Sequence, residues 1–235
     1  MKQFKLGLLA LTILVSVQTT QAQTVDEIVN KNITAMGGKE KLATLKTVRM
    51  EGLLNTQGTD VNLVITRSTL VGQRIDISAM GMDGYRINTP TAGWNFMPFM
   101  GQTSPEAMKD DQIKAGIAVL DIQGNLFNYK DKGTTVEFLG MEKVDSADCY
   151  KLKATLKSGK VMTYFIDTKT NYVVKTVNTQ NLNGKESEVA SIFSNYKPTA
   201  DGYIFPWTNI ATEGQIDFSK IEANVPVDAK IFTSN

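Results

Sequence analysis

The chain has 235 residues, 42% hydrophobic and 21% charged, which is enough to bury a sizeable core. It contains no histidine, and this excludes histidine-dependent catalytic triads and zinc sites built on histidine and cysteine. Its formal net charge of +1 offers no basic footprint for nucleic acid or an anionic membrane.

Residues 1–22 have the pattern of a secretory signal peptide. The first five residues are basic, residues 6–17 are an apolar run, and Thr20-Gln21-Ala22 offers small residues for cleavage. The run is shorter than the roughly 20 residues that span a bilayer. Cleavage removes Lys2 and Lys5, leaving 23 basic and 24 acidic residues, a net charge of −1. We expect a soluble periplasmic protein without a transmembrane segment.

The only cysteine, Cys149, excludes an internal disulfide and a lipid anchor at the cleavage site. It alternates in phase with Lys151 and Lys153, not with Tyr150 and Leu152. We therefore expect an inert thiol on the less buried face, at the start of a strand.

A helix is predicted at the start of the mature chain from the spacing of its apolar residues. Val25, Ile28, Val29, Ile33 and Met36 recur at the period of a helix. Thr24 and Glu27 form a capping box before it, Gly37-Gly38 ends it, and a short second helix is expected over 39–45.

From Thr47 the hydrophobic period changes to two, which indicates strands. Turns are expected at 57–60, at Asp83-Gly84 and at 91–93. The expected strands cover residues 47–55, 61–70, 73–80, 85–88 and 93–97.

The stretch from Gly93 to Met100 is unusually rich in aromatic and methionine residues, and a helix start is predicted directly after it. Ser104 suits an N-cap, Pro105 the first helical position and Glu106 the helix dipole. The predicted helix carries an apolar stripe as far as Gly124, with Gly116 as a weak point. We interpret the stretch as a hinge between a sheet and a helical lid, with Pro98 ending strand pairing.

Seven further strands are predicted after the lid. Hairpin turns are expected at 157–160, Asn183-Gly184 and Glu213-Gly214. A meander of eleven or twelve strands must curl, because open sheets rarely exceed about ten. The fold class is mainly β with helices (α+β): a curled antiparallel sheet forming an incomplete β-barrel with a helical lid, in a single domain over residues 23–235. The seven strands cover residues 134–142, 149–157, 160–167, 172–179, 186–196, 208–212 and 215–223.

Paired carboxylates are the remaining catalytic option. Asp110 and Asp111 are neighbours that point about 100° apart on a helix, and Asp145, Asp148 and Asp167 fall at turns as local caps. No phosphate loop or calcium loop is present. We therefore expect no enzyme activity, cofactor or metal, and a carboxylate-dependent hydrolase stays a lesser alternative.

Ten methionines and ten phenylalanines suit a cavity for pliable apolar ligands. Five of the methionines lie between the fourth strand and the predicted lid: Met80, Met82, Met97, Met100 and Met108. A solid, adaptable core is equally compatible with this composition.

Several motifs resemble the LolA/LolB-like superfamily of periplasmic lipoprotein carriers and outer-membrane lipoprotein-sorting proteins. Asp83-Gly84 precedes a tryptophan strand, Gly93-Trp94-Asn95-Phe96-Met97-Pro98-Phe99, whose proline leads to a lid. Similarity continues in Tyr150-Lys151-Leu152, Gly159, Tyr164-Phe165-Ile166-Asp167, and the close from Ile216 to Pro226, with Asn224, before Phe232.

This resemblance implies a half-open barrel that binds acyl chains beneath its lid. The chain has extra sequence around residues 60–82. The familiar carrier's functional arginine has no matching motif here, and Arg67, Arg74 and Arg86 are the candidates.

We therefore expect a non-enzymatic periplasmic carrier or binding protein for lipid-like ligands, namely lipoprotein acyl chains, without nucleic acid as a partner. The alternative is an envelope structural or interaction module whose cavity is filled by its own side chains and which presents a sheet edge to a protein partner. The predicted ligand-binding residues are Trp94, Phe96, Met97 and Phe99 on the sheet side and Met108, Ile113, Ile117 and Leu120 on the lid.

Overall fold

A computed structural model describes residues 24–56, 58–182 and 185–234. The predicted signal peptide and the predicted turn at Asn183-Gly184 lie outside the described residues. No helix of the described part is long and apolar enough to cross a membrane. The helices are α1 (Val25–Ala35), α2 (Lys39–Ala43) and α3 (Asp110–Gly116), and the 3-10 helices are η1 (Pro98–Met100), η2 (Ile117–Leu120) and η3 (Ala229–Phe232).

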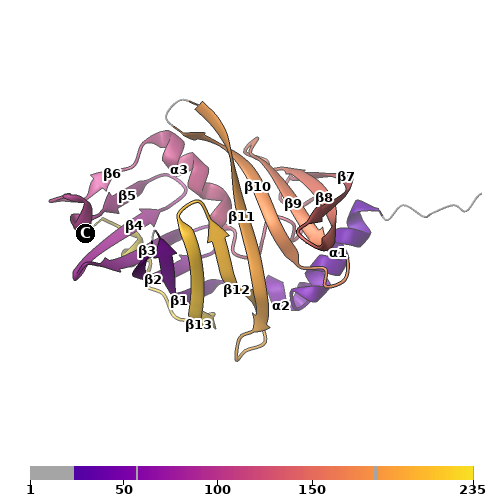
Figure 1. The fold of residues 1–235 in the computed structure, drawn as a ribbon, viewed down its shortest axis with the longest axis horizontal. Helices are drawn as coiled ribbons and strands as arrows, with labels where there is room; N and C mark the ends of the chain where they lie inside the picture. Colours follow the sequence, from indigo (N-terminus) through magenta and orange to yellow (C-terminus); the bar gives the residue numbers. More distant parts are fainter. Residues whose placement is uncertain (1–23, 57, 183–184, 235) are drawn as a thin grey trace, which may run out of the picture.

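All strands of the described part belong to one antiparallel sheet that curls without closing (Figure 1). Its order is β6-β5-β4-β3-β2-β1-β13-β12-β11-β10-β9-β8-β7, which leaves β6 and β7 as edges. The predicted fold class is confirmed. The strands are β1 (Thr47–Thr56), β2 (Thr59–Ser68), β3 (Gly72–Ala79), β4 (Met82–Asn88), β5 (Gly93–Phe96), β6 (Glu106–Ala107), β7 (Thr135–Val144), β8 (Ala147–Thr155), β9 (Val161–Asp167), β10 (Val173–Leu182), β11 (Lys185–Pro198), β12 (Ile204–Ala211) and β13 (Gly214–Ala223).

Two meanders, β1–β6 and β7–β13, make up this sheet. They meet where β1 pairs with β13, with Met50 opposite Ile221. This is the one neighbouring pair of described strands that is not consecutive in the chain. The segment between β6 and β7 therefore has to cross the sheet, and it carries α3 and η2.

One face of the sheet, which we call the inner face, carries the hydrophobic core. Helix α1 packs its buried Ile28 and Val29 against Leu152 and Ile166 of β8 and β9. The predicted capping box of α1 is confirmed, because the side chains of Thr24 and Glu27 accept hydrogen bonds from each other's backbone N–H groups. A second cluster lies on β1, β2 and β13, and it contains Val48, Met50, Ile65 and Ile221.

The predicted helix start at Ser104-Pro105-Glu106 is wrong. Glu106 and Ala107 form the short strand β6, which pairs with Asn95 and Trp94 and satisfies backbone groups at the edge of β5. Helix α3 begins later, at Asp110. Gly116 is confirmed as a break, since the α-helix ends there and the 3-10 helix η2 follows.

The predicted turn at Asp83-Gly84 is also wrong. Both residues lie inside β4, and the hairpin turns at Met80-Gly81, which have φ angles of 55° and 75°. Gly84 serves a close approach instead, because a Cβ there would lie 2.5 Å from Phe96 O and 3.0 Å from Phe99 Cε1.

Cys149 is fully buried, contrary to the predicted exposure. Its phase in β8 is as predicted, but it is flanked by its cross-strand partners Glu142 and Asp167. Its Sγ lies 3.6 Å from the Ala147 carbonyl oxygen. Burial raises the pKa of the thiol.

The opposite, outer face is crossed by the C-terminal segment, residues 224–234, which ends beside β4 and β5 (Figure 1). The Thr47 hydroxyl donates to the Val225 carbonyl at 2.6 Å, and the Tyr85 hydroxyl to that of Ser234 at 3.2 Å. Phe232 is buried against Gly72, where a Cβ would lie 2.7 Å from its ring. The lack of a side chain at Gly72 therefore leaves room for the Phe232 ring to pack on β3.

Candidate ligand-binding site

Residues 108–120, which include α3 and η2, lie directly on the inner face of β4 and β5, and we call them the lid segment. Met108 N donates to Gly93 O at 2.8 Å, and a Cβ on Gly93 would lie 2.5 Å from Met108 Sδ. Further along, a Cβ on Gly116 would lie 2.6 Å from Asn88 Oδ1. Glycine on one side of each contact thus lets the lid segment approach the sheet closely.

Besides the bond from Met108 to Gly93, three hydrogen bonds tie the lid segment to residues outside it. Lys160 Nζ donates to the Ala115 carbonyl at 2.9 Å, and burial lowers the pKa of this lysine. Leu70 N donates to the Leu120 carbonyl at 2.9 Å, and Asn125 Nδ2 lies 3.5 Å from that of Ala118. The Lys160 bond is the one that reaches across to β9.

A polar row crosses the inner face beside the lid segment. Arg67, Gln73, Asn88 and Gly93 are successive cross-strand partners on β2, β3, β4 and β5. Arg67 Nε donates to Gln73 Oε1 at 2.6 Å, and Gln73 and Asn88 are buried. Desolvation lowers the pKa of Arg67 to about 10.

Among the three candidate arginines, Arg67 alone combines desolvation with the lack of an ion pair to a carboxylate of the described residues. Arg74 pairs with Asp76 on the outer face at 2.7 Å. Arg86 is exposed and donates to Asn95. A charged group buried without a counter-ion is costly, which singles out Arg67 for a role beyond stability.

Four of the eight predicted ligand-binding residues belong to the lid segment, and Met97 and Phe99 directly follow β5. Met108 lies over Gly93, and Phe99 over Gly84. Within the lid segment Ile113 and Leu120 are buried and Ile117 is half-buried. Met97, just after β5, is buried as well.

Trp94 and Phe96 are placed on the outer face, away from the lid segment. Trp94 pairs with Ile87 and Phe96 with Tyr85, and both alternate with Gly93, on which Met108 rests. The Phe96 and Tyr85 rings lie 5.8 Å apart, next to the C-terminal segment. The expectation that these two residues line the sheet side of the site beneath the lid is therefore wrong, because the strand period turns them outward.

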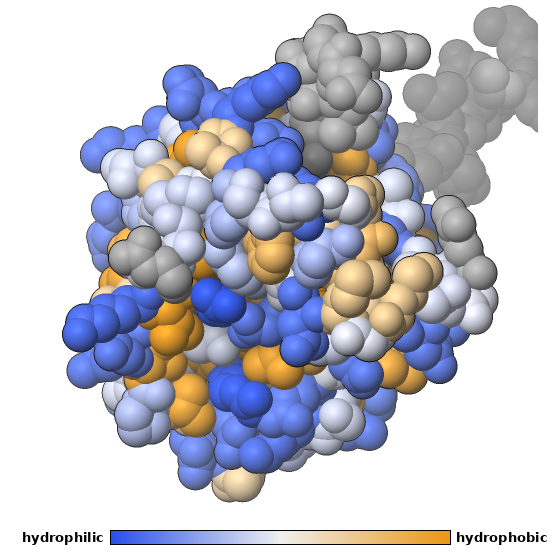
Figure 2. All heavy atoms as spheres, turned by 90° about the vertical axis from the view of Figure 1, so that its left-hand side faces the viewer, coloured by the Kyte–Doolittle hydropathy of each residue, from blue (hydrophilic) through white to orange (hydrophobic). Residues whose placement is uncertain are grey.

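The methionines near β4 do not form one enclosed lining. Met80, Met82 and Met100 are 79%, 38% and 77% exposed, whereas Met97 is buried. Figure 2 shows the β5–β6 end of the molecule, where hydrophobic side chains lie in separate patches among hydrophilic ones.

The inner face has two chemically different halves. On β13, β1, β2 and β3, apart from Arg67 and Gln73 of the polar row, seven inward residues are aliphatic or aromatic, and we call them the apolar half: Val48, Met50, Leu63, Ile65, Ile75, Phe218 and Ile221. On β10, β11 and β12 four inward residues bear hydroxyl or amide groups, which we call the polar strip: Thr176, Asn178, Ser191 and Asn209. Sequence reasoning missed this strip, although Thr176 and Asn178 interrupt the apolar alternation of β10.

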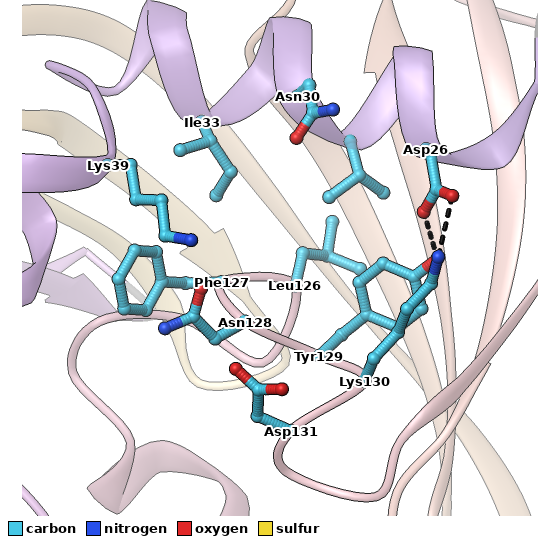
Figure 3. Close-up of a pocket in the computed structure, with 11 residues that line it drawn as sticks. Asp26, Asn30, Ile33, Lys39, Leu126, Phe127, Asn128, Tyr129, Lys130 and Asp131 are labelled. Atoms are coloured by element: carbon cyan, nitrogen blue, oxygen red, sulfur yellow. Dashed lines mark hydrogen bonds and ion pairs between the residues drawn. The ribbon is translucent and has the colours of Figure 1, made fainter.

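A separate open cleft of about 220 Å³ lies between α1 and the loop of residues 126–131 (Figure 3). Val29, Ile33 and Leu126 supply its apolar wall. At one end Tyr129 Oη and Lys130 Nζ both donate to Asp26 at 2.6 Å, and the Lys130 bond is the main cause that lowers the pKa of that carboxyl. Neither this cleft nor a second one near residues 43–47 is lined by Trp94 or the lid segment.

No protein-family model matches the sequence, and the comparison with curated proteins gives no match. Solved structures do match its fold. A LolA superfamily protein from Nitrosomonas europaea aligns with a TM-score of 0.55 at 16% identity, over 90% of this chain and 98% of that one. A DUF1329 family protein from Desulfovibrio piger aligns with a TM-score of 0.55 at 14% identity, over the same shares.

An outer membrane lipoprotein-sorting protein domain from Vibrio parahaemolyticus aligns with a TM-score of 0.51 at 14% identity, over 88% of this chain and 94% of that one. The fold is therefore LolA-like, as the sequence motifs suggested. At these identities the likeness concerns the fold alone.

Proposed function

We propose that the protein is a periplasmic carrier or binding protein for lipid-like ligands, with lipoprotein acyl chains as the cargo in outer-membrane lipoprotein sorting. One observation carries the proposal: a short lid segment lies on β4 and β5, next to the apolar half of the inner face, and four hydrogen bonds tie it to other described residues. The LolA-like fold, shared with a lipoprotein-sorting domain, supports it.

In this proposal the lid segment lifts from β4 and β5, and an acyl chain enters there and extends onto the neighbouring apolar half. Each methylene moved from water to that surface contributes about 0.8 kcal/mol. Met108, which rests on Gly93 of β5 when the lid is closed, would have to move to let the chain in. Repacking of the lid would then drive release.

The alternative is an envelope interaction module with a self-filled interior. The observation that favours it is the direct seating of Met108 on Gly93 and of Gly116 on Asn88, which closes the lid on the sheet. A module of this kind would keep its lid closed and act through its surface.

A reversible disulfide across the lid distinguishes the two. A Cβ on Gly116 would lie 2.7 Å from Asn88 Cγ, which places the two Cβ atoms within the roughly 3.5–4.5 Å that a disulfide requires. The variant combines Asn88→Cys and Gly116→Cys in a Cys149→Ser background. Uptake of a fluorescent fatty acid should be lost when the variant is oxidised and return on reduction, so the reduced protein is its own control.

Extraction of lipids from protein purified out of its native envelope, followed by mass spectrometry, completes the test. A co-purifying lipid or acylated peptide is expected. Absence of any such ligand, together with no uptake of the fluorescent fatty acid by wild-type or reduced protein, would contradict the carrier and favour the interaction module. Equal uptake by oxidised and reduced protein would exclude this lid as the gate.

A further inference from the structure

Two side-chain oxygens of the polar strip are buried without a hydrogen-bond partner: Asn178 Oδ1 on β10 and Asn209 Oδ1 on β12. Buried polar atoms in proteins are nearly always paired, and a buried acceptor left without a donor costs free energy. They are the only such atoms in the described part of the chain, and both belong to one face of one half of the sheet.

Strand register places both amides on the inner face. Asn178 pairs with Met162, next to the pair of Thr176 and Tyr164, and Tyr164 packs in the core beneath α1. Asn209 pairs with Ile216 and follows Trp207, which packs against the core of the apolar half. Asn209 therefore borders the apolar half, on which the proposed acyl chain lies, and Asn178 lies two strands further on, beside the core beneath α1.

The spacing of the two amides indicates the size of the group that would satisfy them. Asn178 pairs with Val189 of β11 and Asn209 with Phe193, so they are two strands and four residues apart. At roughly 4.8 Å per strand and 3.3 Å per residue their Cα atoms are about 16 Å apart. A single hydroxyl cannot reach both, whereas an extended group with several donors can.

The charge of this region indicates the chemistry of that group. The four residues of the polar strip are uncharged, and Ser191 lies between the two amides along β11. Hydroxyl and amide groups pair well with O–H and N–H donors, without the desolvation cost that a buried ion brings.

We propose that the polar strip is a head-group subsite: it holds an uncharged, extended head rich in O–H or N–H donors, while the acyl chain of the same amphiphile lies on the apolar half. The subsite proposal rests on the proposed function, and it narrows the class of ligand to amphiphiles with such a head group. The shared chemistry fits the peptide of an acylated peptide and the sugars of a glycolipid.

Titration calorimetry with three probes that share one dodecyl-length chain tests the subsite: dodecanol, dodecyl maltoside, and the amide of lauroyl-glycylglycine. At least one headed probe should bind about tenfold more tightly than dodecanol, the gain from two hydrogen bonds. In the double variant Asn178→Leu, Asn209→Leu this advantage should disappear while dodecanol binding stays unchanged. The tighter headed probe identifies the source of the head, sugar or peptide.

Thermal unfolding of the same variants is the second readout. Replacing two unpaired buried amides by leucine should leave the unliganded protein at least as stable as wild type. Asn62→Leu, at an exposed position of β2, is the matched control and should change neither property. The subsite proposal would be overturned if wild type bound all three probes with equal affinity, or if the double variant weakened the binding of all three equally. Neither outcome would contradict the proposed carrier function. Failure of every probe to bind would overturn both.

Discussion

The apolar half and the polar strip of the inner face are built with the same strand geometry but carry opposite chemistry. In the apolar half, Met50, Ile65 and Ile221 are buried against each other across three strands. In the polar strip, Asn178 and Asn209 point to the same side and lack partners for their oxygens. A sheet can thus keep one half for stability and the other for recognition.

Stability should therefore be unevenly distributed. Burial of aliphatic side chains contributes roughly 1.5–3 kcal/mol each, whereas a partly exposed hydroxyl contributes little. Changes in the apolar half should unfold the protein, and changes in the polar strip should alter binding alone.

The largest effect is expected for Ile65→Ala, which leaves a cavity in the apolar half. Ile65 is 4% exposed, and such truncations cost about 2–5 kcal/mol. The matched change in the polar strip, Ser191→Ala, should cost less than about 0.5 kcal/mol. Urea denaturation monitored by tryptophan fluorescence measures both. Equal costs would remove the distinction between the halves.

The titration of Tyr164 tests whether water is excluded from the border of the polar strip. Burial raises the pKa of its phenol to about 12. The folded state then holds this proton more tightly than the unfolded state, whose pKa is near 10. The protonated phenol therefore contributes fully to the free energy of unfolding below pH 10, and this contribution falls by at most about 3 kcal/mol as the pH rises from 10 to 12. Unfolding free energies at pH 8 to 11 should show this fall, reduced in Tyr164→Phe. Parallel curves would indicate a hydrated phenol.

Gly116→Ala should lift the lid segment off the apolar side of the sheet. Alanine favours helix by about 1 kcal/mol over glycine, but its Cβ would meet the Asn88 amide at 2.6–2.7 Å. We expect faster amide hydrogen exchange in residues 110–120 and faster uptake of a fluorescent fatty acid. The added change Asn88→Ser makes room and should restore protection. Unchanged exchange in Gly116→Ala would show that the contact does not hold the lid.

Lys160→Met should have a small effect on stability, within about 1 kcal/mol, because one hydrogen bond is lost and a partly buried charge is removed with it. The Ala115 carbonyl loses its tie to β9, so exchange in the lid segment should rise without a change in β8 or β9. Lys114→Met, on an exposed lid residue, is the control. A loss of several kcal/mol would assign Lys160 to the core instead.

Much of the fold follows from periodicity and turn chemistry in the sequence. The capping box of Thr24 and Glu27, the switch to period two at Thr47 and the seven strands after the lid correspond to elements of the structure. The errors fall where tertiary contacts override local preference. Ser104-Pro105-Glu106 suits a helix start, but pairing with the edge of β5 is available to Glu106 and Ala107.

The candidate site was less accessible to sequence reasoning. In the sequence Gly84 suggests a turn, but in the structure it lies in a strand, and glycine is required there because the Phe99 ring packs against its backbone. Trp94 reads as a ligand residue, but which face of a strand it occupies depends on register with β4. Asn178 and Asn209 are ordinary residues in the sequence, and only the pairing of four strands brings them to one face.

The pairing of β1 with β13 has a consequence for how the chain folds. During synthesis, β1 emerges early but its partner β13 is the last strand to emerge, and Phe232, which packs on Gly72 of β3, emerges after it. Contacts between residues so distant in sequence form slowly. The first meander should therefore stay open, with its apolar side chains exposed to water, until the final residues have been synthesised, and a chaperone could bind these side chains during that period.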